Sequence, residues 1–200
     1  ANVYTLSGVP ITGLTRDNIA LRGALADAGG QIVSVQNVTA DDIDFSVLLV
    51  IDTSSSMYGP PLERTKQAAR TFIDNLRPTD PVALVSFNSD VQLVQDYTLD
   101  RELMGAAIES LQSSGRTALY DAAADALRYV GQSPTNRRII VFLSDGQEDR
   151  GSESATRFGS IGAARDAGIP MYTIGFGSVD QVYMGRLAEE SGAQFFLAPS

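Results

Sequence analysis

The stretch Phe45-Ser-Val-Leu-Leu-Val-Ile51, followed by Asp52-Thr-Ser-Ser-Ser56, decides the fold of this 200-residue chain. Its first seven residues are almost wholly apolar and rich in β-branched side chains, which predicts a buried β-strand. The Asp-x-Ser-x-Ser array follows on the loop that leads from this strand to a helix. Such a loop brings one carboxylate and two hydroxyls close to a single point. Hard oxygen donors of this kind suit Mg²⁺, Mn²⁺ or Ca²⁺.

From residue 45 onward, short apolar runs alternate with longer amphipathic ones. The expected strands are Phe45–Ile51, Val82–Phe87, Val91–Gln95, Arg138–Leu143, Pro170–Ile174 and Gln194–Leu197, and the expected helices are Leu62–Leu76, Asp100–Leu111, Thr117–Val130, Ser154–Ala167 and Val179–Ser191. A short turn between the second and third strands indicates a hairpin. The alternation predicts an α/β fold over residues 45–200: a doubly wound, mostly parallel central sheet with one antiparallel edge strand, flanked by helices.

Residues 1–44 differ in character, and we expect a short β-rich N-terminal extension. Gln31–Val38 has the pattern of a strand. Asn18–Ala24 either pairs with it as a hairpin, which we favour, or forms a short helix capped at Thr15. Three aspartates close this part and are interpreted as a solvated linker rather than a second cation site: Asp41, Asp42 and Asp44.

The composition excludes several classes of function. A net charge of −9 argues against nucleic acid or an anionic membrane surface as partner. The chain has no His and no Cys, so a Ser-His-Asp triad, a His- or Cys-ligated zinc site and thiol chemistry are impossible within it. Its single lysine, Lys66, does not belong to a phosphate-binding loop. No apolar stretch approaches the roughly 18–20 residues that span a membrane.

Two later segments carry oxygen donors that complement the first. Gly115-Arg116-Thr117 comes just before a predicted helix, and Leu143-Ser-Asp145-Gly146 ends a predicted strand. Ligands of doubly wound sheets bind beyond the carboxyl ends of the strands, where the strand order reverses. The candidate metal ligands are therefore Asp52, Ser54, Ser56, Thr117 and Asp145.

With these three segments in this order, the chain resembles a von Willebrand factor type A domain of the bacterial type, and they match its metal-ion-dependent adhesion site. The resemblance covers residues 45 to 198 and includes the landmarks Pro78–Phe87 and Gly168–Gly175. It implies a Rossmann-like fold in which Ser54 and Ser56 bind the cation directly. The two aspartates and Thr117 would bind it directly or through water.

The resemblance also implies a function. We expect a divalent-metal-dependent protein-binding (adhesion) module, not an enzyme, that captures an Asp or Glu side chain of a partner protein. Two carboxylates neutralise a divalent ion, and the hydroxyls add no charge, so an incoming carboxylate is favoured at an open coordination position. Tyr58 and Arg116 are candidates for the partner-binding rim, although both suit an ordinary exposed loop. Arg116 stands where the family often has glycine.

Weaker sequence features bear on the cellular location of the protein and on the element that follows its last strand. Residues 8–18 resemble a β-rich lead-in of bacterial surface or secreted proteins, so an extracytoplasmic location is favoured and a cytoplasmic one stays open. The family usually closes with a helix after its last strand. Here the sequence stops at Phe195–Ser200, and we expect that helix to be absent.

Alternative interpretations remain for the function and for each residue. The domain could be a metal-free scaffold, or a Mg²⁺-dependent phosphoryl hydrolase with Asp52 as nucleophile. The hydrolase is disfavoured because Ser54 stands where a second aspartate is expected. Asp52 could merely cap the next helix, the serines could be plain loop residues, Thr117 could act as an N-cap, and Asp145 could belong to a simple turn. We interpret Glu148 and Asp149 as a solvated loop rather than ligands.

Overall fold

The central strand of the computed structural model is β1 (Phe45–Asp52), and the structure describes residues 14–20, 22, 27–32, 44–149 and 154–198. β1 pairs in parallel with β2 (Val82–Phe87) on one side and with β4 (Arg137–Ser144) on the other. β3 (Val91–Thr98) runs antiparallel to β2, whereas β5 (Met171–Gly175) and β6 (Phe195–Leu197) continue the parallel sheet beyond β4. The strand order is β3-β2-β1-β4-β5-β6, so it reverses between β1 and β4.

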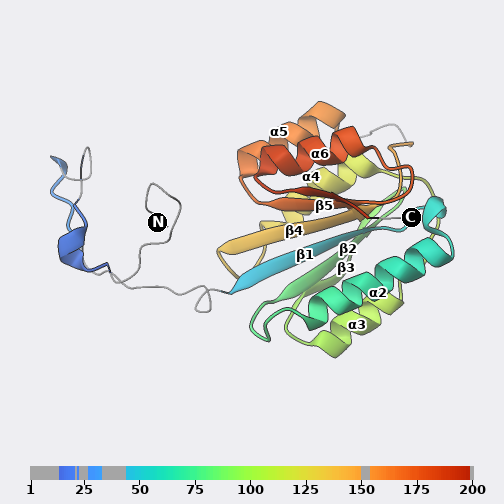
Figure 1. The fold of residues 1–200 in the computed structure, drawn as a ribbon, viewed down its shortest axis with the longest axis horizontal. Coiled ribbons are helices and arrows are strands. Elements are labelled where there is room, and N and C mark those ends of the chain that lie inside the picture. Colours follow the sequence, from blue (N-terminus) through green and yellow to red (C-terminus); the bar gives the residue numbers. More distant parts are fainter. Residues whose placement is uncertain (1–13, 21, 23–26, 33–43, 150–153, 199–200) are drawn as a thin grey trace. The chain divides into compact units, whose positions relative to one another are not determined.

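Helices cover both faces of this sheet (Figure 1). Their bounds are α2 (Pro60–Asp74), α3 (Arg101–Glu109), α4 (Leu119–Val130), α5 (Arg157–Ala167) and α6 (Gln181–Ser191). α2 and α3 pack on one face, and α4, α5 and α6 pack on the other. The predicted fold class is confirmed, including the single antiparallel edge strand.

The position of β1 inside the sheet explains why Phe45–Ile51 is almost continuously apolar. Successive side chains of a strand point to opposite faces, and both faces of this sheet are covered. Leu48 and Val50 pack with the α4–α6 layer, whereas Leu49 and Ile51 pack with α2 and α3. All four side chains are buried. Burial of this strand on both sides fixes its register, and hence the place where Asp52 leaves the sheet.

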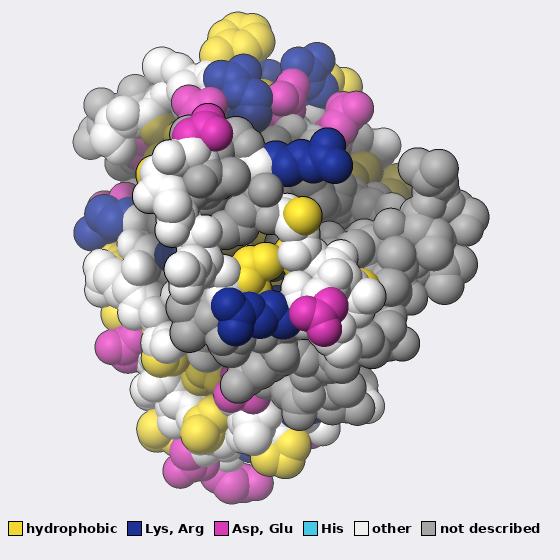
Figure 2. Space-filling model, turned by 90° about the vertical axis from the view of Figure 1, so that its left-hand side faces the viewer, with side chains coloured by type: hydrophobic (Ala, Val, Ile, Leu, Met, Phe, Trp, Pro, Cys, Tyr) yellow, Lys and Arg dark blue, Asp and Glu magenta, His cyan; other side chains and the backbone are white. Residues whose placement is uncertain are grey.

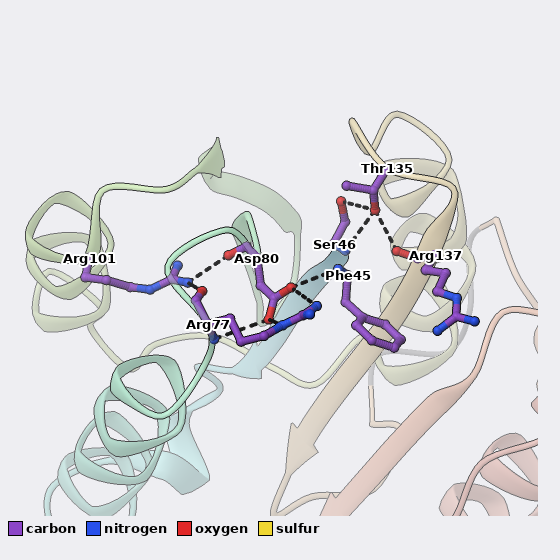
Figure 3. Close-up of polar contacts among 7 residues, drawn as sticks. All are labelled: Phe45, Ser46, Arg77, Asp80, Arg101, Thr135 and Arg137. Carbon is purple, nitrogen blue, oxygen red and sulfur yellow. Dashed lines mark hydrogen bonds and ion pairs between the residues drawn. The ribbon is translucent and has the colours of Figure 1, made fainter. Parts of the chain in front are cut away.

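A polar cluster holds the amino end of β1 (Figure 3). Asp80 accepts the Phe45 N–H at 2.9 Å and an Arg77 guanidinium N–H at 2.7 Å. Partial burial acts to raise the pKa of Asp80, but the hydrogen bonds from Arg77 and Phe45 outweigh it and hold the pKa below its ordinary value. On the other side, the Ser46 N–H donates to the Thr135 hydroxyl at 3.0 Å. These contacts tie the start of β1 to the turns before β2 and β4.

Arginines are prominent at this amino end. The guanidinium groups of Arg77 and Arg137 lie 5.7 and 5.4 Å from the centroid of the Phe45 ring, within cation–π range. Arg101 donates to the carbonyl oxygens of Arg77 and Asp80, at 2.8 Å each (Figure 3). Figure 2, which turns the left-hand side of Figure 1 toward the viewer, shows described side chains of both charges and some hydrophobic ones on the surface. The candidate metal ligands lie at the opposite, carboxyl end of the parallel strands.

On the α2 side of the sheet an apolar groove of about 420 Å³ lies between α2 and strands β4 to β6. Phe72, Val141, Tyr172 and Phe196 are among its lining residues. A second groove of about 350 Å³ shares Leu143 and Ile174 with the first and reaches Asp145. β6 is the last element that the structure describes, and none of the described residues that follow it is helical.

The chain divides into two compact units, Ala1–Ile43 and Asp44–Ser200. In the first, Arg16–Asn18 forms one 3₁₀ turn, in which the Thr15 N–H donates to Asn18 Oδ1 at 2.9 Å. Most of the predicted hairpin, and most of the Gln31–Val38 strand, lie outside the described residues, so both remain predictions. None of the helices in the described part is long and apolar enough to cross a membrane.

Candidate metal site

Asp52 ends β1 and is wholly buried. Its Oδ1 accepts the Ser54 N–H at 2.8 Å, and its Oδ2 accepts the Ser144 hydroxyl at 2.6 Å. Burial raises the pKa of Asp52 to about 6, the hydrogen bonds from Ser144 and Ser54 oppose that rise, and the charge of Asp145 adds to it. Among the described residues, no arginine or lysine pairs with this carboxylate. A buried carboxylate of this kind is a strong place for a cation.

Ser54, Ser56 and Asp145 form a chain of hydrogen bonds beside it. The two serine hydroxyls lie 3.0 Å apart, and the Ser56 hydroxyl donates to Asp145 Oδ1 at 2.7 Å. Ser54 is buried, whereas Ser56 is exposed and Asp145 is half-buried. Ser56 and Asp145, which follow β1 and β4 and lie 89 residues apart in sequence, therefore face one another at the switch point between the two strands.

Thr117 approaches the same point from a third loop. The hydroxyl oxygen of Thr117 would lie 3.2 Å from a Cβ added at Gly146, and Asp52 Oδ2 would lie 3.7 Å from it. The Gly146 N–H donates to the Ser144 hydroxyl at 3.2 Å. A side chain at position 146 would therefore crowd the space between two candidate ligands. The glycine of the Ser-Asp-Gly motif keeps that space open.

Backbone hydrogen bonds join the loop of Ser54 to the loop of Thr117 and to the end of β2. The Ser114 N–H donates to the Thr53 carbonyl at 2.8 Å, and the Ser55 N–H donates to the Gly115 carbonyl at 3.0 Å. The Thr53 N–H bonds the Phe87 carbonyl at 2.7 Å. Gly115 has φ +74°, a left-handed conformation that glycine adopts without strain. Candidate ligand positions are thus set by main-chain contacts as well as by side chains.

The two predicted rim residues, Tyr58 and Arg116, are exposed, and the Tyr58 side chain is 80% accessible to solvent. The Arg116 N–H donates to the Ser89 hydroxyl at 3.0 Å, which orients its loop. Within the described part of the chain, no carboxylate forms an ion pair with the Arg116 guanidinium. The possible pair between Arg116 and Asp145 is not formed in this structure, where Asp145 accepts the Ser56 hydroxyl.

Sequence reasoning missed the role of Glu148 and Asp149. The Thr117 N–H donates to Asp149 Oδ1 at 2.6 Å, and the Tyr120 N–H donates to Glu148 Oε2 at 3.1 Å. Both acids do lie on a loop, where Asp149 is exposed and Glu148 half-buried, but each also accepts a backbone N–H at or just before the start of α4. The signal in the sequence was Ala118, which precedes α4 and has no side chain able to cap it.

The donor set fits a hard divalent cation. It combines two carboxylates with three hydroxyls, and it contains no sulfur or imidazole. No group of three or more acidic, His or Cys side chains within the described ranges could hold a metal. The hydroxyls of Ser54, Ser56 and Thr117 would therefore have to complete the coordination.

Comparison with known proteins identifies the family. The family model for the von Willebrand factor type A domain matches residues 46–200. The chain belongs to this family. Its domains are typically protein–protein interaction or adhesion modules. The predicted resemblance is confirmed over nearly the whole of the Asp44–Ser200 unit.

Curated relatives of this von Willebrand factor type A chain are bacterial. A UPF0353 protein of Mycobacterium ulcerans (strain Agy99) is 30% identical over 184 residues, covering 76% of this chain and 55% of the relative. A UPF0353 protein of Mycolicibacterium vanbaalenii is 31% identical over 186 residues, with coverage of 77% and 55%. The chain thus spans about half the length of these relatives.

Solved structures show the same fold. A von Willebrand factor type A protein from Catenulispora acidiphila superposes with a TM-score of 0.71 at 19% identity, covering 79% of this chain and 39% of that one. The von Willebrand factor domain of the type V pili tip protein Mfa5 from Porphyromonas gingivalis gives 0.66 at 15% identity, covering 78% and 90%. At these identities the likeness concerns the fold alone.

Proposed function

We propose that this domain is a divalent-metal-dependent adhesion module that captures an Asp or Glu carboxylate of a partner protein. The observation that carries the proposal is the meeting of Asp52, Ser54, Ser56 and Asp145, with Thr117 close by, at the switch point of the sheet. Family membership supports a binding role, since these domains typically mediate protein–protein contacts.

Each donor has a distinct part in holding Mg²⁺, or Mn²⁺ or Ca²⁺ in its place. Asp52 is buried and would supply negative charge from the interior side of the site, whereas Asp145 and Ser56 lie nearer the solvent. The hydroxyls of Ser54 and Thr117 add ligands without adding charge. A bound cation supplies an electron-poor coordination position that attracts an external carboxylate.

The surroundings of the site favour binding over hydrolysis. The chain contains no His or Cys, and the residue two positions after Asp52 is a serine. Tyr58 and Arg116 offer an exposed ring and an exposed guanidinium for the partner to contact. An aromatic ring and an arginine are frequent anchors of protein interfaces. Arg116 would also favour an acidic partner.

We further propose an extracytoplasmic location. Similar folds occur in a type V pili tip protein, in the minor pilin PilB of Streptococcus sanguinis and in an aerotolerance-related membrane protein of Bacteroides fragilis. A partner outside the cytoplasm, bound in a medium that contains divalent ions, fits an adhesion role.

Calorimetric titration with Mg²⁺ and Mn²⁺ tests the metal. Wild type should bind one ion, Asp145→Ala should lose binding, and Asp166→Ala should behave as wild type because Asp166 lies exposed in the last turn of α5. A peptide array tests the carboxylate, with each Asp or Glu peptide matched by its Asn or Gln counterpart. Binding should be confined to the acidic peptides and abolished by EDTA. Binding that persists in EDTA and in Asp145→Ala would indicate a metal-free scaffold instead.

A further inference from the structure

Helix α4 begins differently from its neighbours. The N-cap residues of α3, α5 and α6 accept N–H groups of their own first turns: Asp100, Thr156 and Asp180. α4 follows Ala118, which has no side chain to accept a hydrogen bond. Instead, Glu148 accepts the Tyr120 N–H in the first turn of α4, and Asp149 accepts the N–H of Thr117, two residues ahead of the helix; both acids lie on the loop that follows the candidate ligand Asp145.

The contact between Thr117 and Asp149 is reciprocal. The Thr117 N–H donates to Asp149 Oδ1 at 2.6 Å, and the Asp149 N–H donates to the Thr117 carbonyl at 3.3 Å. These residues are 32 positions apart in sequence. Thr117 is buried and its hydroxyl faces Gly146, whereas Asp149 is exposed. Two opposed hydrogen bonds restrict both the position and the rotation of the Thr117 backbone.

We infer that Asp149 is a positioning residue that holds the Thr117 hydroxyl in place for the metal. We name the contacts of Glu148 and Asp149 with the start of α4 the α4 clasp. The inference rests on the proposed metal-binding function, because it assigns Asp149 a part in that same site. The clasp also ties the loop of Asp145 to the loop of Thr117, so the two donors are positioned together.

Charge and geometry favour this role over a merely structural one. The N-terminus of a helix carries partial positive charge, which the two carboxylates of the clasp offset. A carboxylate that accepts a backbone N–H makes a stronger bond than a neutral acceptor. Removal of a residue that holds a metal ligand in place by a hydrogen bond typically lowers metal affinity about 10- to 100-fold.

Two substitutions separate positioning from charge. Asp149→Asn removes the negative charge but keeps an oxygen that can accept the Thr117 N–H, whereas Asp149→Ala removes both. We expect Asp149→Ala to weaken Mg²⁺ and Mn²⁺ binding by about tenfold or more, and Asp149→Asn to stay close to wild type. The free energy of unfolding, measured in EDTA, shows that each variant is folded. Asp166→Ala is the matched control for loss of an exposed acid on the same domain.

Hydrogen exchange of the Thr117 amide provides a readout that needs no metal. In EDTA, Asp149→Ala should exchange this amide faster than wild type, and Asp149→Asn should not. Equal loss of metal affinity in both Asp149 variants would show a through-space effect of charge and overturn the inference. Unchanged affinity in Asp149→Ala, with normal binding by wild type, would overturn the inference alone. Failure of wild type to bind either ion would overturn the proposed function and the inference together.

Discussion

Asp52→Asn should stabilise the metal-free protein while it destroys the metal site. Burial raises the pKa of Asp52 to about 6 from an ordinary 3.8, so ionising this carboxyl in the folded protein is unfavourable. That difference corresponds to about 3 kcal/mol of unfolding free energy, to order of magnitude. An asparagine keeps the acceptor for the Ser54 N–H, and the Ser144 hydroxyl can accept from the new amide. Little is therefore lost to offset the gain.

The pH dependence gives this prediction its sign. Because the folded pKa is raised, the stability that Asp52 contributes in its neutral form is fully present below pH 3.8 and is lost as the pH rises through about 6. The advantage of Asp52→Asn should therefore be largest at pH 7.5 and only a small fraction of that at pH 4. Urea unfolding in EDTA at both pH values measures it. A variant that is no more stable than wild type at pH 7.5 would show that the buried charge costs little.

Metal should reverse the order of stability. A ligand that binds only the folded state stabilises it by mass action, so excess Mg²⁺ should stabilise wild type. Asp52→Asn should gain nothing from the same addition. The buried charge of Asp52 would thus destabilise the metal-free protein and stabilise the metal-bound one. Metal binding would account for the presence of a residue that lowers stability. Equal stabilisation of both proteins by Mg²⁺ would place the ion elsewhere.

Three further substitutions test other contacts, each by urea unfolding. Asp80→Asn should destabilise the protein by about 1–3 kcal/mol, because it weakens the bonds to Arg77 and to the start of β1, and the loss should shrink as acid protonates the wild-type carboxyl. Gly115→Ala should cost about 1–2 kcal/mol, because φ is +74° and the added methyl would lie 2.7 Å from a serine hydroxyl. Gly105→Ala should be neutral or stabilising by up to about 1 kcal/mol, because the overlapping group is the mobile end of Arg70 and alanine favours helix.

The fold could be predicted from the sequence because its signals are local. The run Phe45–Ile51 is apolar on both faces, which only a strand inside a covered sheet requires. The turn at 88–90 marked the single antiparallel strand. Asp52 and Asp145 each follow a strand of the same parallel sheet. The rule that ligands bind at the carboxyl ends of such strands, where the strand order reverses, was enough to place them near one another.

Contacts between distant segments could not be predicted in the same way. α4 was expected from Thr117 but begins at Leu119, and the Thr117 N–H ahead of the helix is bound by Asp149 from a distant loop. α5 was expected from Ser154 but begins at Arg157, because Thr156 is its N-cap and accepts the Gly159 N–H, while Ser154 and Ala155 ahead of it donate to Asp121. In both cases a carboxylate from a distant segment binds residues just ahead of the helix, a contact that no local sequence pattern reveals.

The strand order has a consequence for the time course of folding. β1 lies between β2 and β4, and the bond that joins Ser144 to Asp52 closes a loop of 92 residues. Contacts of such long range form late and slowly, because the chain must lose loop entropy before they contribute. A cation that needs oxygens from all three loops can therefore act only after β4 has joined β1. It should slow unfolding while leaving the rate of folding almost unchanged.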